Sequence, residues 1–262
     1  MVKKGNWFFL LFGFLGGVLL LFIILPFVTL CSNQSLENLV TVVQEESVLL
    51  AFLNSFILAA IASFLAILFG TPLAYLLSRR MVPISGFWHA IVDLPLAVPH
   101  SIVGIALLFF LGGNSIFGAL FNNIFRFGFV GTRIAIVAAM LFVSLPYAVN
   151  AAKEAFDRIS VRIEQVAASL GAPPASVFFR VSLPLAKGGI SSGAILTWAR
   201  AVSEFGAVVV LAYHPMTAPV KIWDEFTTGT LERAGAIAVI FLFLCLSVFI
   251  VLRLLLRKQK NG

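Results

Sequence analysis

The chain has 262 residues, 61% of them hydrophobic and 11% charged, and its mean hydropathy is +1.07. A soluble domain of this size cannot bury so much apolar surface, so the composition excludes that class and predicts a protein with several spans in a lipid bilayer. The net charge of +7 would suggest a nucleic-acid partner in a soluble protein. In a membrane protein basic loops instead mark the cytoplasmic side, so we expect no nucleic-acid partner.

Six apolar segments are long enough to cross about 30 Å of hydrocarbon. In chain order they lie near 7–30, 48–77, 90–112, 133–152, 189–212 and 235–256. They predict an all-α membrane protein with six transmembrane helices in a single domain, 1–262. The first segment is longer than the apolar part of a signal peptide and no small-residue cleavage site follows it, so we expect a retained helix.

Basic residues predict how these segments are oriented. If both ends of the chain are cytoplasmic, thirteen Lys and Arg residues lie at the cytoplasmic ends of the segments and four lie at the outer ends. The positive-inside rule therefore favours an N-in, C-in arrangement. The loop between the fourth and fifth segments is then cytoplasmic.

The third segment, 90–112, has an irregular first half. Asp93, Pro95, Pro99 and His100 all lie there. Broken helices in membranes are tolerated where they face protein or water rather than lipid, so this segment is expected to face the interior of the protein. After it, apolar residues between 116 and 125 recur at helical spacing and predict a short interfacial or re-entrant helix.

The loop 160–184 is a passage of mixed polarity that predicts a helix–turn–helix elbow. An apolar stripe at i, i+3, i+4 and i+7 favours a short amphipathic helix. The stripe consists of Ile163, Val166, Ala167 and Leu170, and the opposite face of Arg162, Glu164, Gln165 and Ser169. Gly171 should end this helix in a left-handed conformation; Pro173 or Pro174 should begin a second short helix and Pro184 should end it. We interpret the elbow as a socket for another protein, the alternative being an ordinary amphipathic surface helix.

The elbow resembles the "EAA" coupling loop of permease subunits in ATP-binding-cassette (ABC) importers. The pattern of that loop is Glu-Ala-Ala, three residues, Gly, nine residues, then Ile-x-Leu-Pro. Gln165 stands in the place of the motif's Glu, Val166 replaces an Ala, and Glu164 lies one residue early. The resemblance implies a set of residues that couple to an ATPase subunit: Glu164, Gln165, Ala167, Ala168, Leu170, Gly171, Val181, Leu183 and Pro184.

The sequence carries no energy source or reaction centre of its own. It has no G-x-x-x-x-G-K-[ST] phosphate-binding loop and no Gly-Lys dipeptide, so ATP must be bound by a partner subunit. His89, His100 and His214 lie far apart, and none has a second His or Cys at i+3 or i+4. No nucleophile–base pair is recognisable. We therefore expect a transport subunit rather than an enzyme, with no metal or cofactor.

Arg200 and Glu204 lie at i and i+4 inside the fifth segment. A charge within the membrane costs about 3 kcal/mol or more, so the two side chains are expected to pair. Small residues at 189, 193 and 197 let a neighbouring helix approach this segment closely. The pair is interpreted either as part of the wall of an anion pathway or as a structural clip between helices.

Three stretches, Ile91–His100, Ser203–Val210 and Tyr213–Pro219, are similar to the permease subunits of molybdate and tungstate ABC importers. The similarity runs from about Gly70 to the end of the chain, and the family-like core is about 48–256. The resemblance implies the type I importer permease fold in a prokaryotic inner membrane. It also implies a second copy of the chain, two ATPase subunits and an extracytoplasmic oxyanion-binding protein. Sulfate and thiosulfate permeases are similar and form the alternative.

A tetrahedral dianion favours cationic, hydroxyl and amide donors along its path. The candidate residues for this path are Pro99, His100, Ser101, Thr197, Arg200, Ser203 and Glu204. A secondary transporter without an ATPase should show repeats in its two halves, and a channel should show a pore-loop filter. The sequence shows neither feature, so these two alternatives are the weaker ones.

Overall fold

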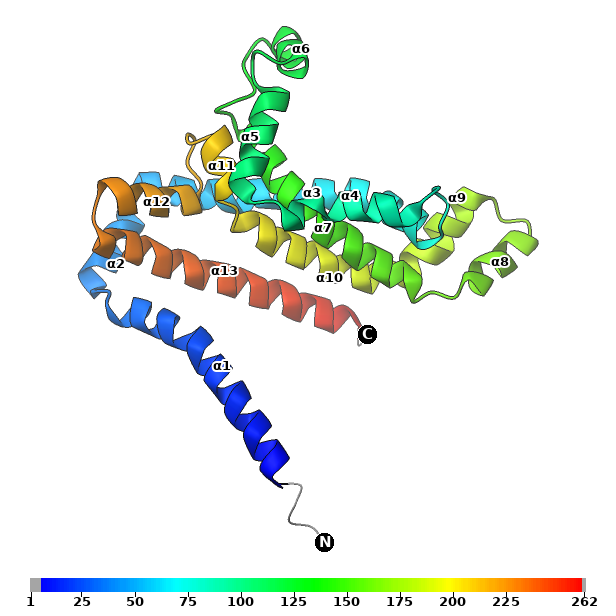
Figure 1. Cartoon of the computed structure of the whole chain (residues 1–262), viewed down its shortest axis with the longest axis horizontal. Helices are drawn as coiled ribbons and strands as arrows, with labels where there is room; N and C mark the ends of the chain where they lie inside the picture. Colours follow the sequence, from blue (N-terminus) through cyan, green and yellow to red (C-terminus); the bar gives the residue numbers. More distant parts are fainter. Residues whose placement is uncertain (1–5, 261–262) are drawn as a thin grey trace.

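The structure is a computed structural model that describes residues 6–260. Every regular element in this range is helical, as predicted, and short connections join the helices (Figure 1). In chain order the elements are α1 (Asn6–Ser32), α2 (Leu36–Gln44), α3 (Glu46–Ser78), α4 (Ser85–Ala97), α5 (His100–Leu111), α6 (Ile116–Phe125), α7 (Arg133–Asp157), α8 (Val161–Ser169), α9 (Pro174–Val177), the π-helical turn η1 (Phe178–Ser182), α10 (Leu183–Val202), α11 (Gly206–Leu211), α12 (Ala218–Thr228) and α13 (Leu231–Lys260).

The centre of the bundle is formed by α3, α7 and α10, which pack side by side. Four alanines of α3 between 59 and 74 are fully buried. A Cβ added to Gly189 of α10 would lie 2.5 Å from that of Ala155 on α7, and one added to Gly193 would lie 2.5 Å from that of Ala151. Lipid gives membrane helices no hydrophobic driving force toward each other, so this close van der Waals contact stabilises the bundle. The predicted small face of the fifth segment is confirmed.

Four helices, α1, α3, α7 and α13, are long and apolar enough to cross a membrane. They correspond to the predicted spans 7–30, 48–77, 133–152 and 235–256. A fifth span results if α4 and α5, which are bent by 111° at their junction, are counted together. Six spans and the N-in, C-in orientation therefore remain predictions.

The predicted third span, 90–112, divides into α4 and α5, which confirms the irregularity expected in its first half. Pro99 has no backbone N–H to donate, and its ring forces the preceding Val98 into an extended conformation with φ −95° and ψ 133°. The helix must end at that point and begin again at His100. The irregularity expected from Pro95 and Pro99 is a sharp bend between α4 and α5.

The predicted fifth span, 189–212, is wrong as one continuous helix. α10 ends at Val202 and the chain starts again as α11 at Gly206. The carboxylate of Glu204 accepts the backbone N–H of Ala207 at 2.9 Å, which satisfies one of the free amides at the start of α11. This bond favours a new helix start over continuation of α10.

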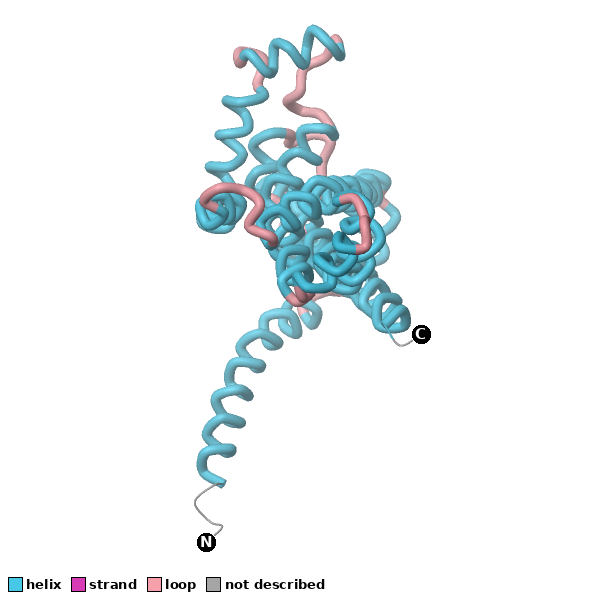
Figure 2. Tube along the Cα trace, turned by 90° about the vertical axis from the view of Figure 1, so that its right-hand side faces the viewer, coloured by secondary structure: helices cyan, strands magenta, loops and turns pink. Residues whose placement is uncertain are grey.

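Two segments extend away from the central bundle. α5 leads to the predicted short helix α6, where the Ser115 hydroxyl accepts the N–H of Gly118 at 2.8 Å. On the other side α1 runs away from the bundle, as Figure 2 shows, and its apolar side chains are exposed along its length. In a bilayer these faces are available to lipid or to another protein chain.

Candidate functional site

The break between α10 and α11 brings three ionisable side chains together. Arg200, in the last turn of α10, donates from Nη2 to Oε2 of Glu204 at 2.8 Å. His100, at the start of α5, has its Nδ1 3.3 Å from the same oxygen, and its two ring nitrogens lie 2.9 and 2.8 Å from Arg200 Nη2. The predicted Arg200–Glu204 pair is confirmed, but it joins the end of α10 to the start of α11 instead of lying on one helix.

The buried carboxylate of Glu204 bonds the other members of this cluster. Only 1% of its side chain is exposed. Its Oε1 accepts the N–H of Ala207 and its Oε2 accepts Arg200, so both oxygens have partners. A buried carboxylate requires such pairing because desolvation of an unpaired charge is costly. Glu204 therefore fixes the guanidinium of Arg200 at a defined position.

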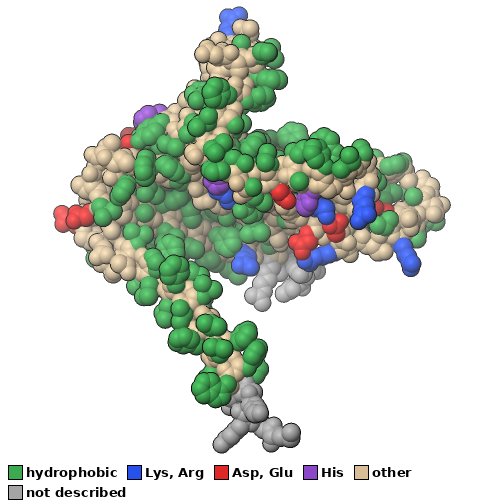
Figure 3. All heavy atoms as spheres, viewed as in Figure 1, with side chains coloured by type: hydrophobic (Ala, Val, Ile, Leu, Met, Phe, Trp, Pro, Cys, Tyr) green, Lys and Arg blue, Asp and Glu red, His purple; other side chains and the backbone are tan. Residues whose placement is uncertain are grey.

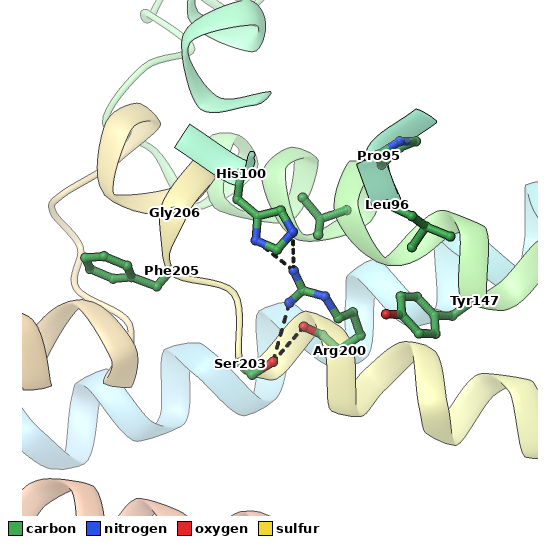
Figure 4. A pocket seen from close by; sticks show the side chains of 9 residues that line it. Pro95, Leu96, His100, Tyr147, Arg200, Ser203, Phe205 and Gly206 are labelled. Atoms are coloured by element: carbon green, nitrogen blue, oxygen red, sulfur yellow. Dashed lines mark hydrogen bonds between the residues drawn. The ribbon is translucent and has the colours of Figure 1, made fainter. Parts of the chain in front are cut away.

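A pocket of about 520 Å³ opens beside the cluster. In Figure 4 the side chains of Arg200 and His100 point toward each other at its wall, and Ser203 Oγ lies 3.5 Å from Arg200 Nη1. The lining residues are Pro95, Leu96, His100, Val143, Tyr147, Arg200, Ser203, Phe205 and Gly206. Gly206 is required here, because a Cβ at this position would lie 2.8 Å from the Cβ of His100. The pocket thus presents guanidinium, imidazole and hydroxyl groups, which suit an anion.

The structure does not bring every predicted path residue to this pocket. Thr197 is fully buried and its hydroxyl donates to the carbonyl of Gly193 at 2.8 Å. Pro99 caps α5 and Ser101 is exposed on it, and neither lines the pocket. Tyr147, in contrast, lines the pocket although the sequence reasoning did not select it. Its signal in the sequence was a polar hydroxyl inside the predicted span 133–152.

A band of polar side chains continues from the pocket along α7 and α4. Asn150, three residues after Tyr147 on α7, donates to Asp93 at 2.7 Å and contacts His89 Nε2 at 2.8 Å. One turn further, Lys153 bonds Asp157 at 2.7 Å. Figure 3 shows His, acidic and basic side chains gathered on the face where α4, α7 and α10 lie in Figure 1. The part of this band inside the predicted span 133–152, which includes Asn150, needs to face water or protein rather than lipid.

The predicted elbow at 160–184 is confirmed in most of its parts. α8 ends at Ser169, and Gly171 adopts a left-handed φ of +87°. Pro174 occupies the first turn of α9, as predicted. The prediction that Pro184 ends the second helix is wrong: η1 continues directly into α10, and Pro184 is the second residue of α10.

The apolar stripe of α8 is exposed, whereas one residue of the predicted polar face is not. Ile163, Val166 and Leu170 are 48%, 60% and 83% exposed. Glu164, placed on the polar face by the sequence pattern, is instead buried. Arg79, at the end of α3, donates to its two oxygens at 2.7 to 3.1 Å, and Ser182 donates to Oε1 at 2.6 Å. The sequence pattern of α8 could not predict this burial, because the cation that pairs with Glu164 lies 85 residues earlier in the chain.

These contacts determine the protonation of Glu164. Burial by itself raises the pKa of a carboxyl group. The hydrogen bonds from Arg79 and Ser182, together with the charge of Arg79, outweigh burial and hold the pKa of Glu164 below its ordinary value. Glu164 is therefore an anion at neutral pH.

Similarity to known proteins agrees with this geometry. Residues 66–261 match the family described as binding-protein-dependent transport system inner membrane component. The chain is 38% identical over 253 residues to the molybdate/tungstate transport system permease protein WtpB of Pyrococcus abyssi, covering 96% of each chain. It is 30% identical over 243 residues to a probable sulfate transport system permease protein of Helicosporidium sp. subsp. Simulium jonesii, covering 90% of each.

The fold is also shared with a solved transporter. The chain is similar to one in the crystal structure of a bacterial alginate ABC transporter in complex with an alginate pentasaccharide-bound periplasmic protein, with a TM-score of 0.74. The match covers 98% of this chain and 96% of that one at 19% identity, which shows a common fold alone. Because the family match spans most of the sequence, this multi-pass membrane protein belongs to the family of binding-protein-dependent transport system inner membrane components.

Proposed function

We propose that this chain is the permease subunit of an ATP-driven importer of molybdate or tungstate, which an extracytoplasmic binding protein delivers. The observation that carries this proposal is the 38% identity, over 96% of both chains, to a molybdate/tungstate permease. The sulfate permease is less similar, at 30% identity, so sulfate or thiosulfate is the weaker candidate. Membership of a binding-protein-dependent family also disfavours a secondary transporter or a channel.

The pocket beside Arg200 is proposed as part of the translocation pathway. A tetrahedral oxyanion is recognised by charge-assisted hydrogen bonds, and Arg200, His100 and Ser203 supply three donor types on one wall. Glu204 is proposed to position Arg200, because both its oxygens already have partners inside the protein. Thr197 is occupied by its own helix and is not proposed as a contact.

A second copy of the chain is proposed to complete the pathway. The polar band over α4, α7 and α10 lies on an exposed face of the single chain, and lipid is a poor environment for it. A two-fold dimer that brings this face together would cover both bands and place two copies of Arg200 near one dianion. Each Arg200 is already paired with its own Glu204, so the two guanidinium groups would act on molybdate as charge-assisted hydrogen-bond donors rather than as a net charge of +2.

The elbow is proposed as the docking site of an ABC ATPase, which binds the ATP. Its exposed stripe of Ile163, Val166 and Leu170 has the i, i+3, i+7 spacing of a helix that lies in a groove of a partner. The polar residues Gln165 and Ser169 flank the stripe and are exposed. A partner with an apolar groove and a polar rim would fit this surface.

The proposal is tested by purifying the permease with its ATPase and measuring ATP hydrolysis on addition of the binding protein. Protein loaded with molybdate or tungstate should stimulate hydrolysis, and protein loaded with sulfate should not. The native mass should correspond to two permeases and two ATPases. Stimulation by the sulfate-loaded protein alone would transfer the proposal to sulfate, and a transporting complex with one permease would refute the dimer.

A further inference from the structure

The elbow is fastened to the membrane helices by one buried ion pair, Arg79–Glu164. The two side chains are 5% and 9% exposed. Among the ion pairs within residues 6–260, this is the one in which both side chains are less than a tenth exposed. Neither residue lines the pocket beside Arg200. The pair is therefore separate from the proposed anion pathway.

Every donor of the Arg79 guanidinium has a partner. Nε and Nη2 donate to Glu164, Nη1 donates to Ser78 Oγ and to the carbonyl of Phe156 at 3.1 Å, and Nη2 also reaches the carbonyl of Ile159 at 3.4 Å. A guanidinium has five N–H groups in a fixed planar geometry, so this set of bonds allows little rotation. Arg79 thus joins the end of α3 rigidly to the end of α7.

Glu164 extends this network to the elbow and to α10. Its carboxylate belongs to α8, accepts Ser182 at the end of η1 at 2.6 Å, and lies 3.3 Å from the hydroxyl of Tyr75 on α3. η1 continues directly into α10. One carboxylate therefore contacts groups from α3 and η1, and through Arg79 it is connected to α7.

Other contacts of α8 with the bundle are sparse. α8 packs mainly against α9 and η1, and its apolar stripe faces outward. The turn at Gly171 separates α8 from α9. The orientation of α8 relative to α3 and α7 consequently depends on the ion pair, because a glycine-containing turn alone does not fix it.

We propose that Arg79 and Glu164 are the positioning residues of ATPase coupling: they transmit a movement of α8 to α3, α7 and α10, and Glu164 does not itself contact the ATPase. This inference rests on the proposed docking of an ATPase at the elbow. The rigid, buried ion pair connects α8 to the ends of α3 and α7, so a displacement of α8 also displaces these helices. The turn at Gly171 alone would not transmit that displacement. Because α7 and α10 carry Tyr147 and Arg200, the movement reaches the pocket.

Three variants separate positioning from docking and from folding. Glu164→Gln keeps the size of the side chain but removes the charge that pairs with Arg79. Ser182→Ala removes one hydrogen bond and leaves the ion pair in place, so it provides a milder change that should fold. The matched control is Glu154→Gln, which breaks the pair with Arg158 near the end of α7, where the side chains are 66% and 76% exposed.

The first measurement is amide hydrogen exchange of α8 in the full-length permease alone. Loss of one partner of a buried ion pair should speed exchange in Glu164→Gln by roughly a hundredfold. Ser182→Ala should give a smaller increase, and Glu154→Gln should match the wild type. Unchanged exchange in both Glu164→Gln and Ser182→Ala would overturn the inference. This readout needs no transport, so a wild-type complex that fails to move molybdate would refute the proposed function and not this link.

The second measurement is made on the complex with its ATPase. Glu164→Gln should retain the ATPase subunit while uptake per ATP hydrolysed falls about fivefold or more. Leu170→Asp, which alters the exposed stripe, should instead lose the ATPase. Normal uptake per ATP in Glu164→Gln would overturn the inference, and so would loss of the ATPase from Glu164→Gln permease that is otherwise folded.

Discussion

Replacing Glu204 by Gln removes the negative charge that holds Arg200 at the pocket. The amide oxygen of glutamine can still accept the N–H of Ala207, so the start of α11 keeps its cap and the change isolates the ion pair. Breaking a buried ion pair by removing one partner destabilises by about 3–5 kcal/mol. Because Arg200 keeps 17% of its side chain exposed, we expect the lower end, about 3 kcal/mol. Arg200→Gln should destabilise similarly, since Glu204 is then buried without a cation.

The double variant, Arg200→Gln with Glu204→Gln, contains no unpaired charge. Its stability should return to within about 1 kcal/mol of the wild type. Transport should nevertheless fail, because the pocket has lost its guanidinium. A hydrogen bond from a charged donor contributes about 2 kcal/mol, so each copy should bind the anion roughly 30-fold less tightly.

Thermal unfolding in detergent and oxyanion uptake in proteoliposomes are measured for both single variants and the double variant. The control is the same cycle on Arg158 and Glu154, where exposure should keep every change within about 1 kcal/mol. A double variant with wild-type stability and full uptake would make Arg200 a structural residue only. A double variant as unstable as the single variants would refute the pairing argument.

Three further predictions concern the elbow and the bundle. Gly171→Val should strain the left-handed turn by about 1–2 kcal/mol and release the ATPase, measured by co-purification; an intact complex would contradict the role of the turn. Gly193→Val should separate α10 from α7, because even a Cβ would lie 2.5 Å from Ala151, and it should lower the unfolding temperature in detergent. The stabilising contribution of ionised Glu164 should be constant above its ordinary pKa near 4.5 and be lost as pH falls through the lowered folded pKa, measured by exchange in α8; loss between pH 8 and pH 6 would contradict the assignment.

Local chemistry explains which parts of the fold could be predicted. The bend at Pro99 and the turn at Gly171 follow from proline and glycine, whose backbone limits are properties of the single residue. No proline or glycine lies in residues 194–205 around the break after Val202, which forms because Glu204 caps a new helix. The pattern of apolar residues alone therefore predicts one continuous helix across that break.

Long-range partners explain what the sequence could not predict. Arg200 and Glu204 were recognisable because their i, i+4 spacing is local. The role of His100 in their cluster, and the burial of Glu164 against Arg79, depend on contacts across 100 and 85 residues. The α8 periodicity placed Glu164 on the polar face, and only the packing of α3 against the elbow shows that this face is partly covered.

The most direct test of the central claim is uptake of radiolabelled molybdate into proteoliposomes that contain this permease and its ATPase, with the binding protein outside the vesicle and ATP inside it. We expect accumulation that requires both ATP and the binding protein, that unlabelled tungstate competes away, and that sulfate in excess leaves unchanged. Uptake that proceeds without ATP or without the binding protein would contradict the account.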